Sequence, residues 1–171
     1  MKISQPSSNE FIESPYQSRY IQAVKGENPF DALKKNILVE VFKNLPEDKL
    51  LYRYAENKWT PKEILGHCID TERILSYRVL CIARGEKLSL PPFEEDDYVL
   101  SANFNKRSLR SLLLEYKAVR KATLELIKNL PTKSLKNIGQ ANNLVCSTRS
   151  LIWVLAGHEL HHLEILKERY L

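Results

Sequence analysis

Glycine is scarce in this sequence of 171 residues: it contains 5, and none of them forms a GxGxxG or GxxxxGK[ST] string. Rossmann and P-loop nucleotide sites need such strings, because glycine lets the backbone approach a phosphate closely. Cysteine is also scarce: Cys68, Cys81 and Cys146 are odd in number and form no CxxC pair. The sequence therefore favours neither a nucleotide-binding fold, nor a disulfide framework, nor a zinc knuckle, and a reducing compartment fits it.

Long hydrophobic runs are missing as well. The apolar stretch Leu151–Gly157 has 7 residues, whereas a helix that spans a bilayer needs ~20. The opening segment MKISQPSSNEF has no apolar core of the kind found in secretion signals. We therefore expect a cytoplasmic protein with no membrane partner.

The net charge of +5 is unevenly distributed along the chain. Residues 106–136 carry nine Lys and Arg against two Glu, whereas residues 94–97 are four consecutive acids. A basic helix can bind nucleic acid. Here, however, five basic residues recur at spacings of 4, 7, 4 and 7, as on one solvated helix face, and no aromatic residue shares that face for base stacking. We expect no nucleic-acid partner. The five are Lys106, Arg110, Lys117, Lys121 and Lys128.

Four long segments have apolar residues at helical spacing, and the apolar fraction of 43% is enough for a buried core. The second segment has the clearest boundaries: residues 60–63, Thr-Pro-Lys-Glu, form a capping box with proline at the first helical position, and Gly85 fits its end. The other predicted helices start at capping residues, which are Asn28, Asn105, and either Ser147 or Thr148. The four predicted helices cover residues 28–45, 60–85, 105–130 and 147–171.

The remaining segments are an arm, a short helix and two links. Residues 1–13 are predicted to be a loose N-terminal arm, and residues 14–171 a single domain. At the start of this domain a short helix is expected to end near Gly26, because four apolar residues before it fall at helical spacing: Tyr16, Tyr20, Ile21 and Val24. Residues 86–104 and 132–146 are predicted to be irregular links, the second containing a strand fragment at Leu144–Cys146.

Four amphipathic helices with almost no strand signal predict an all-α four-helix bundle. The link of 19 residues at 86–104 is far longer than antiparallel neighbours require. We therefore expect it to run back along the whole bundle, so that the second and third long helices are parallel.

The four histidines all fall on predicted helices. In the last helix, residues 151, 155, 158, 162, 165 and 169 follow each other at the a/d spacing of a core-facing seam, and two of them, His158 and His162, are histidines. Residues four apart on a helix lie about 40° apart around its axis, so both imidazoles can reach one point. Burying such polar rings without partners costs a few kcal/mol each. A divalent metal would resolve this cost, because it binds neutral imidazole nitrogen.

A third histidine on another helix supports the metal interpretation. His67 flanks the apolar stripe of the second helix, and three histidines would leave a metal position open for water or substrate, which is typical of catalytic sites. The alternative is a set of hydrogen-bonded core histidines. His158-Glu159-Leu160-His161-His162 also matches the HExxH string of zinc proteases, although only nine residues follow it and none is a further histidine. His161 lies about 100° from His162 and is not part of the seam.

Several short motifs together resemble those of the DinB-like (DinB/YfiT-like) metalloprotein superfamily. The resemblance covers roughly residues 14–171. Its motifs are Trp59-Thr60-Pro61-Lys62-Glu63-Ile64-Leu65-Gly66-His67, Asp70-x-Glu72-Arg73, Pro92-Phe93-Glu94-Glu95-Asp96-Asp97-Tyr98, Ala102-Asn103-Phe104-Asn105 and Ala156-Gly157-His158-Glu159-Leu160-His161-His162.

This resemblance implies a fold and a metal. The expected fold is a four-helix bundle with up-down-down-up topology. Family members typically bind one divalent metal, zinc or nickel among them, through three histidines, which by motif matching are His67, His158 and His162. Characterised relatives use a low-molecular-weight thiol such as bacillithiol, mycothiol or glutathione, as thiol S-transferases or a thiol-dependent isomerase, and others are regarded as hydrolases.

We therefore expect a metal-dependent enzyme that transfers a small thiol to an electrophilic small molecule. The alternatives are a hydrolase with a metal-activated water and a non-catalytic bundle with structural histidines, which would act as a homodimer. The sequence assigns no catalytic residue and no residue that binds the thiol. Asp70, one turn after His67, is a candidate for orienting a metal ligand.

Other residues near these motifs have structural interpretations. Glu72 and Arg73 are interpreted as a structural salt bridge, and Cys68 as a small core residue. Trp59 is expected to pack at the entrance of the second helix. The acidic run at 94–97 is either a solvated loop or part of the rim of a pocket.

Overall fold

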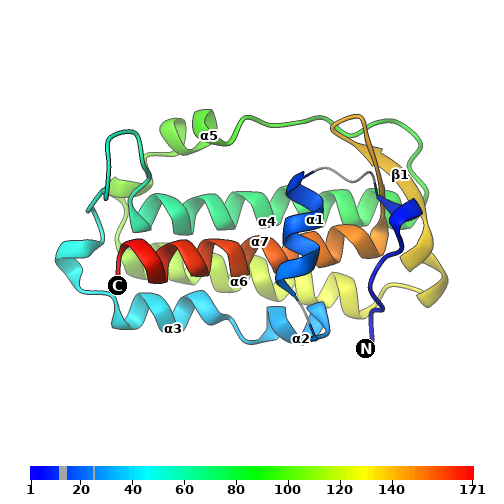
Figure 1. The fold of residues 1–171 in the computed structure, drawn as a ribbon, viewed down its shortest axis with the longest axis horizontal. Coiled ribbons are helices and arrows are strands. Elements are labelled where there is room, and N and C mark those ends of the chain that lie inside the picture. Colours follow the sequence, from blue (N-terminus) through cyan, green and yellow to red (C-terminus); the bar gives the residue numbers. More distant parts are fainter. Residues whose placement is uncertain (12–14, 25) are drawn as a thin grey trace.

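The computed structural model describes residues 1–11, 15–24 and 26–171. Within this part of the chain, four helical segments lie side by side along the long axis of the molecule (Figure 1). The first is made of α2 (Pro29–Lys34) and α3 (Ile37–Asn44), and the others are α4 (Pro61–Arg84), α6 (Leu109–Lys128) and α7 (Thr148–Arg169). In Figure 1, α4 and α6 run in one direction and α3 and α7 in the other, which is the expected up-down-down-up four-helix bundle.

The segment from residue 86 to residue 104, called the crossover below, runs back along the bundle (Figure 1). At one end, the Leu90 N–H donates to the Gln140 carbonyl at 3.0 Å. At the other end it contains α5 (Glu95–Ala102) and leads into a 3₁₀ turn (Phe104–Lys106). The parallel arrangement of α4 and α6 predicted from the length of this link is therefore confirmed. The helix α5 inside the crossover was not expected.

The link from α6 to α7 is more regular than the sequence indicates. After a 3₁₀ turn (Thr132–Lys136), β1 (Ile138–Ala141) and β2 (Leu144–Ser147) form an antiparallel hairpin. Asn142 and Asn143 connect the strands with φ of +53° and +56°, the left-handed conformation that two-residue hairpin turns require. The prediction of an irregular link is wrong here, and the strand expected at Leu144–Cys146 is one half of this hairpin.

The predicted boundaries of α4 are confirmed by its hydrogen bonds. The Glu63 N–H donates to Thr60 Oγ1 at 3.2 Å, and the Glu63 carboxylate accepts from the Thr60 N–H at 2.7 Å. Gly85 ends the helix with φ of +93°. For α7, Ser147 rather than Thr148 is the cap, because its hydroxyl accepts from the Ser150 N–H at 3.0 Å.

Two predicted helices differ from the structure. The helix expected over 28–45 is broken between α2 and α3, where Asn36 adopts φ of +48° and donates from its side chain to the Lys34 carbonyl at 3.0 Å. The helix expected from Asn105 begins at Leu109 with Ser108 as its cap. Asn105 is engaged elsewhere: its amide oxygen accepts from Thr60 Oγ1 at 2.6 Å, which ties the 3₁₀ turn after the crossover to the start of α4.

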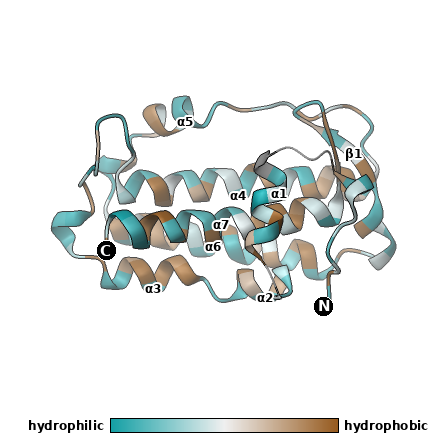
Figure 2. Ribbon diagram, in the orientation of Figure 1, coloured by the Kyte–Doolittle hydropathy of each residue, from teal (hydrophilic) through white to brown (hydrophobic). Residues whose placement is uncertain are grey.

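The core consists of two apolar clusters separated by a polar layer. One cluster joins α1 (Pro15–Ala23), α2, the second half of α4 and the first half of α7. The other joins α3, hydrophobic over most of its length (Figure 2), to the first halves of α4 and α6 and the end of α7. Between them, residues 67–72 of α4 and 158–162 of α7 contribute buried histidines and acids. Among the described residues, no helix is both long and apolar enough to cross a bilayer.

The N-terminal segment, expected to be loose, lies against the bundle over residues 3–11. The Ile3 side chain is buried, a 3₁₀ turn (Ser8–Glu10) follows, and Glu10 forms an ion pair with Arg149 of α7. Phe11 forms an isolated bridge with Cys146, beside the hairpin. Residues 12–14, with the predicted boundary between arm and domain, lie outside the described residues, as does the side chain of Tyr16, and this boundary stays a prediction.

Candidate metal centre

Three of the four histidines meet in the polar layer of the core. His67 comes from α4, and His158 and His162 come from successive turns of α7. All three side chains are buried, with exposed fractions of 3%, 7% and 6%. His158 Nε2 lies 2.9 Å from His67 Nε2 and 3.2 Å from His162 Nε2, and the three ligand atoms lie within 4.8 Å of one another. We call these three residues the histidine cluster.

The helices bring the cluster together because α4 and α7 are packed antiparallel neighbours. Gly157 lets α1 approach α7 beside the cluster, since a Cβ at this position would lie 1.8 Å from the Tyr20 carbonyl oxygen. The Tyr20 ring then meets the His158 ring edge-on, with centroids 5.4 Å apart. His161 lies outside the cluster: it is half-buried and its ring contacts those of Tyr20 and His162.

Burial keeps the three imidazoles neutral. Desolvation lowers the pKa of His67 to about 4 and those of His158 and His162 well below the usual value, and the neighbouring histidines add to the effect. A neutral ring nitrogen either donates or accepts one hydrogen bond. His158 Nε2 therefore cannot satisfy both of its neighbours, so the three imidazoles cannot all be paired with one another through these atoms.

This donor set fits a divalent cation. Zinc binds imidazole nitrogen at 2.0–2.1 Å, so two ligand atoms on a tetrahedral ion would lie about 3.3 Å apart, close to the 2.9 and 3.2 Å found here. His162 Nδ1 is buried without a hydrogen-bond partner among the described residues, and His67 Nδ1 lies 3.5 Å from Thr71 Oγ1.

Comparison with known proteins supports the same fold. The profile of the DinB superfamily matches residues 34–166. The chain belongs to the DinB superfamily. No curated protein matches the chain. Among solved structures it is similar to YfiT from Bacillus subtilis, with a TM-score of 0.69 and 15% sequence identity over 97% of this chain and 92% of that chain. The description of that structure is "a probable metal-dependent hydrolase with an unusual four-helix bundle topology".

A buried polar network lies next to the cluster of this DinB protein and was not foreseen from the sequence. Arg120 of α6, 2% exposed, donates to Glu72 at 2.8–3.1 Å, to Glu159 at 2.7 Å and to the Leu33 carbonyl at 2.7 Å. Tyr116 OH donates to the other oxygen of Glu159. The sequence contains one signal for this network: Arg120 lies four residues after Tyr116, so it places a charged side chain on the apolar stripe of its helix.

The network defines the role of Glu159. Both of its carboxylate oxygens are engaged, one by Arg120 and one by Tyr116. Burial raises the pKa of this carboxyl, while Arg120 and Tyr116 oppose the shift. The HExxH interpretation needs this glutamate as a general base at the metal. In this structure the carboxylate is instead part of the structural network.

The contacts of the residues that follow His67 in the DinB motif agree only in part with the sequence analysis. Asp70, the candidate orienting residue, lies 3.7 Å from Arg73, and the side chain that meets His67 Nδ1 is Thr71. Glu72 and Arg73 do not pair with each other: Glu72 binds Arg120, and Arg73 binds Glu115 at 2.7 Å. Cys68 is buried in the apolar core, as expected.

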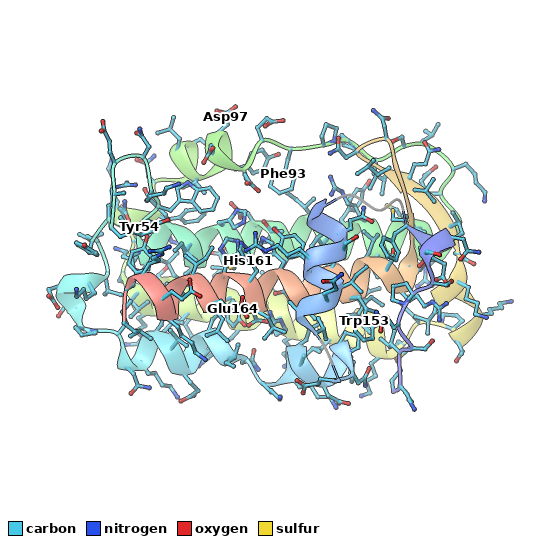
Figure 3. All side chains as sticks on the ribbon, in the orientation of Figure 1. Tyr54, Phe93, Asp97, Trp153, His161 and Glu164 are labelled. Atoms are coloured by element: carbon cyan, nitrogen blue, oxygen red, sulfur yellow. The ribbon has the colours of Figure 1, made fainter. Side chains whose placement is uncertain are left out.

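A cavity of about 250 Å³ opens beside the cluster, and we call it the entrance cavity. His162, Trp59 and Asp96 line it, together with Tyr54 and Tyr170. Of these residues Tyr54 is labelled in Figure 3, between α7 and the crossover. Trp59 packs at the start of α4, as expected, and also covers the cluster, with its ring 4.6 Å from the His67 ring. The acidic run therefore reaches a pocket rim through Asp96.

Proposed function

We propose that this DinB-superfamily protein is an enzyme that uses a divalent metal, zinc or nickel, held by His67, His158 and His162. The observation that supports the proposal is the convergence of three buried, neutral imidazoles, whose ligand atoms lie within 4.8 Å of one another. Three protein ligands leave a position free for a small molecule. The entrance cavity gives such a molecule a path to the cluster, because His162 is part of its lining.

The reaction we favour is transfer of a low-molecular-weight thiol of the bacillithiol or glutathione type to an electrophilic small molecule. A divalent cation in the cluster would lower the pKa of a thiol bound at its free position. Trp59, Tyr54 and Tyr170 supply aromatic walls for the electrophile. The three histidines are at most 7% exposed, so bulk water has little access to the cluster except from the entrance cavity.

The second candidate is hydrolysis by a metal-activated water. The similarity in fold to YfiT favours it, because that protein is described as a probable metal-dependent hydrolase. A hydrolase that uses Glu159 as its general base is disfavoured, because Arg120 and Tyr116 occupy both oxygens of this carboxylate. A small-molecule substrate, a cytoplasmic location and a homodimer remain predictions.

Metal analysis of untagged protein tests the proposal. The purified protein should contain about one divalent metal per chain, and His67→Ala or His158→Ala should abolish metal binding. His161→Ala is the matched control, because this neighbouring histidine lies outside the cluster, and it should retain the metal. Elemental analysis and calorimetric titration with Zn²⁺ measure both. A folded wild-type protein that binds no divalent metal would instead support the non-catalytic bundle.

Measurements of ligand binding distinguish thiol transfer from hydrolysis. Metal-loaded protein should bind a small thiol more tightly than the matching alcohol, because sulfur is the softer ligand and suits a zinc-like ion. Glu159→Gln should leave this preference intact. Hydrolytic activity without thiol dependence that disappears in Glu159→Gln, with metal retained, would reverse the ranking.

A further inference from the structure

Trp59 lies between the entrance cavity and His67. Its indole lines the cavity, whereas His67 does not. The ring centroid is 4.6 Å from that of His67 and 6.3 Å from that of His162, and the indole is tilted only 25° from the His162 ring. A ligand in the cavity meets His162 in its lining, and the indole covers the way on to His67.

The backbone of Trp59 is anchored, whereas its side chain is held at one point. Its carbonyl accepts from Tyr170 OH, and the next residue, Thr60, is the cap of α4. The half-buried indole donates from Nε1 to Asp96 Oδ1 at 3.0 Å, an exposed hydrogen bond to a residue 37 positions away in α5. Such a bond contributes about 1 kcal/mol. This free energy corresponds to a roughly fivefold preference of the indole for the position in which it covers the cluster.

We propose that Trp59 is a gate over the histidine cluster and that Asp96 is its latch. The crossover then does more than connect two parallel helices, because its short helix α5 carries the group that holds the gate closed. Asp96 sets the rate at which metal ions and small ligands reach and leave the Nε2 atoms. The metal part of this inference rests on the proposed function of the cluster.

Metal exchange rates test the latch directly. We expect Asp96→Ala to increase about fivefold both the rate of Zn²⁺ uptake and the rate of Zn²⁺ loss to a chelator, with the Kd unchanged. Asp96→Asn keeps an acceptor oxygen and should retain slow exchange. Asp97→Ala is the matched control: it removes the same charge from the next residue, and Figure 3 shows Asp97 pointing away from the bundle. Its exchange rates should equal those of the wild type.

A double variant tests whether Asp96 acts through the indole. Trp59→Phe keeps an aromatic ring but removes the N–H, so adding Asp96→Ala to it should change neither rate further. An additional acceleration in the double variant would overturn the proposal. A weakened Kd in Asp96→Ala without faster uptake would also overturn it, because Asp96 would then support the site rather than its access.

Fluorescence quenching tests the gate without any metal. The chain has two tryptophans, and Trp153 is 6% exposed, so quenching by acrylamide reports mainly on Trp59. Asp96→Ala should increase the quenching constant, and Asp97→Ala should leave it unchanged. Equal quenching in all three proteins would overturn the gate. If the wild type binds no metal, the proposed function fails, while this measurement still decides whether the indole is latched.

Discussion

Gly157 shows how one residue sets the position of a whole helix. It lies where α1 crosses α7, one residue before His158, and an added Cβ would lie 1.8 Å from the Tyr20 carbonyl oxygen. In an isolated helix, alanine would be better than glycine by about 1 kcal/mol. Here the clash is with backbone, which cannot rotate away, so the steric cost exceeds the gain in helix propensity.

We therefore expect Gly157→Ala to lower the free energy of unfolding by about 3 kcal/mol. Urea denaturation followed by circular dichroism measures this change. Glu164→Ala, an exposed position on the same helix, should change it by less than about 0.5 kcal/mol. An unchanged or higher stability in Gly157→Ala would show that α1 does not pack against α7 as closely as described.

For single residues, the sequence predicted the histidine cluster but not the residues around it. His158 and His162 were recognised because polar residues occupy a seam of apolar spacing, and His67 because it flanks the apolar stripe of the second helix and ends the motif that begins at Trp59. Asp70 was the candidate for orienting a metal ligand, and the side chain that meets His67 Nδ1 is that of Thr71. Adjacent positions on a helix differ by about 100°, so this choice depends on the exact rotation of α4 against its neighbours, which spacing alone does not define.

At the scale of helices, Arg120 connects three elements of the bundle. From α6 it binds Glu72 of α4, Glu159 of α7 and the carbonyl of Leu33 at the end of α2. The side chains of Arg120, Glu72 and Glu159 are all buried. Removing the guanidinium would leave two buried carboxylates without their cation, which is far more costly than losing an exposed ion pair.

We expect Arg120→Met to lower the free energy of unfolding by about 3–5 kcal/mol. Arg73→Met is the matched control: this arginine is half-exposed and pairs with Glu115, so its loss should cost at most about 1 kcal/mol. Chemical denaturation of both variants at neutral pH measures the difference. Equal, small effects would contradict the description of the network as a link between helices.

Helix boundaries were predictable where local hydrogen bonds decide them. The capping box of Thr60 and Glu63 forms as the sequence indicated, since both partners lie within one turn. The start of α6 was misplaced because Asn105 has the right side chain for a cap but binds Thr60, 45 residues away. The break at Asn36 was missed for a similar reason: apolar spacing continues across it, and one left-handed residue redirects the chain.

At the scale of the whole molecule, the length of the link between α4 and α6 predicted the topology. The composition of the N-terminal segment did not predict that it packs against the bundle. The 19 residues of the crossover required a path along the bundle, and this path is present. The N-terminal segment is mostly polar, and its isolated apolar residues, of which Ile3 is buried, gave no periodic signal for docking. Its attachment depends on Glu10, which binds Ser147 at 3.0 Å and Arg149 of α7, both more than 130 residues away.

This attachment should depend on pH. The hydrogen bonds from Arg149, followed by those from Ser7 and Ser147, lower the pKa of Glu10 from 4.5 to about 2. A carboxyl with a lowered pKa in the folded state stabilises the fold fully above its unfolded pKa, and the contribution is lost as the pH falls through the folded pKa. The ion pair should therefore stabilise the protein at neutral pH, and this stabilisation should decrease between pH 4.5 and pH 2.

Replacing the carboxylate isolates this effect from other acid-sensitive groups. Glu10→Gln should lower the free energy of unfolding by about 2 kcal/mol at pH 7, and the difference from wild type should shrink as the pH is lowered towards 2. The histidine cluster protonates in both proteins, so its contribution cancels in the difference. Glu40→Gln, which removes one partner of an exposed pair with Lys43, should have little effect at either pH. A difference for Glu10→Gln that stays constant across this range, measured by urea denaturation, would show that the charge of Glu10 does not hold the N-terminal segment to α7.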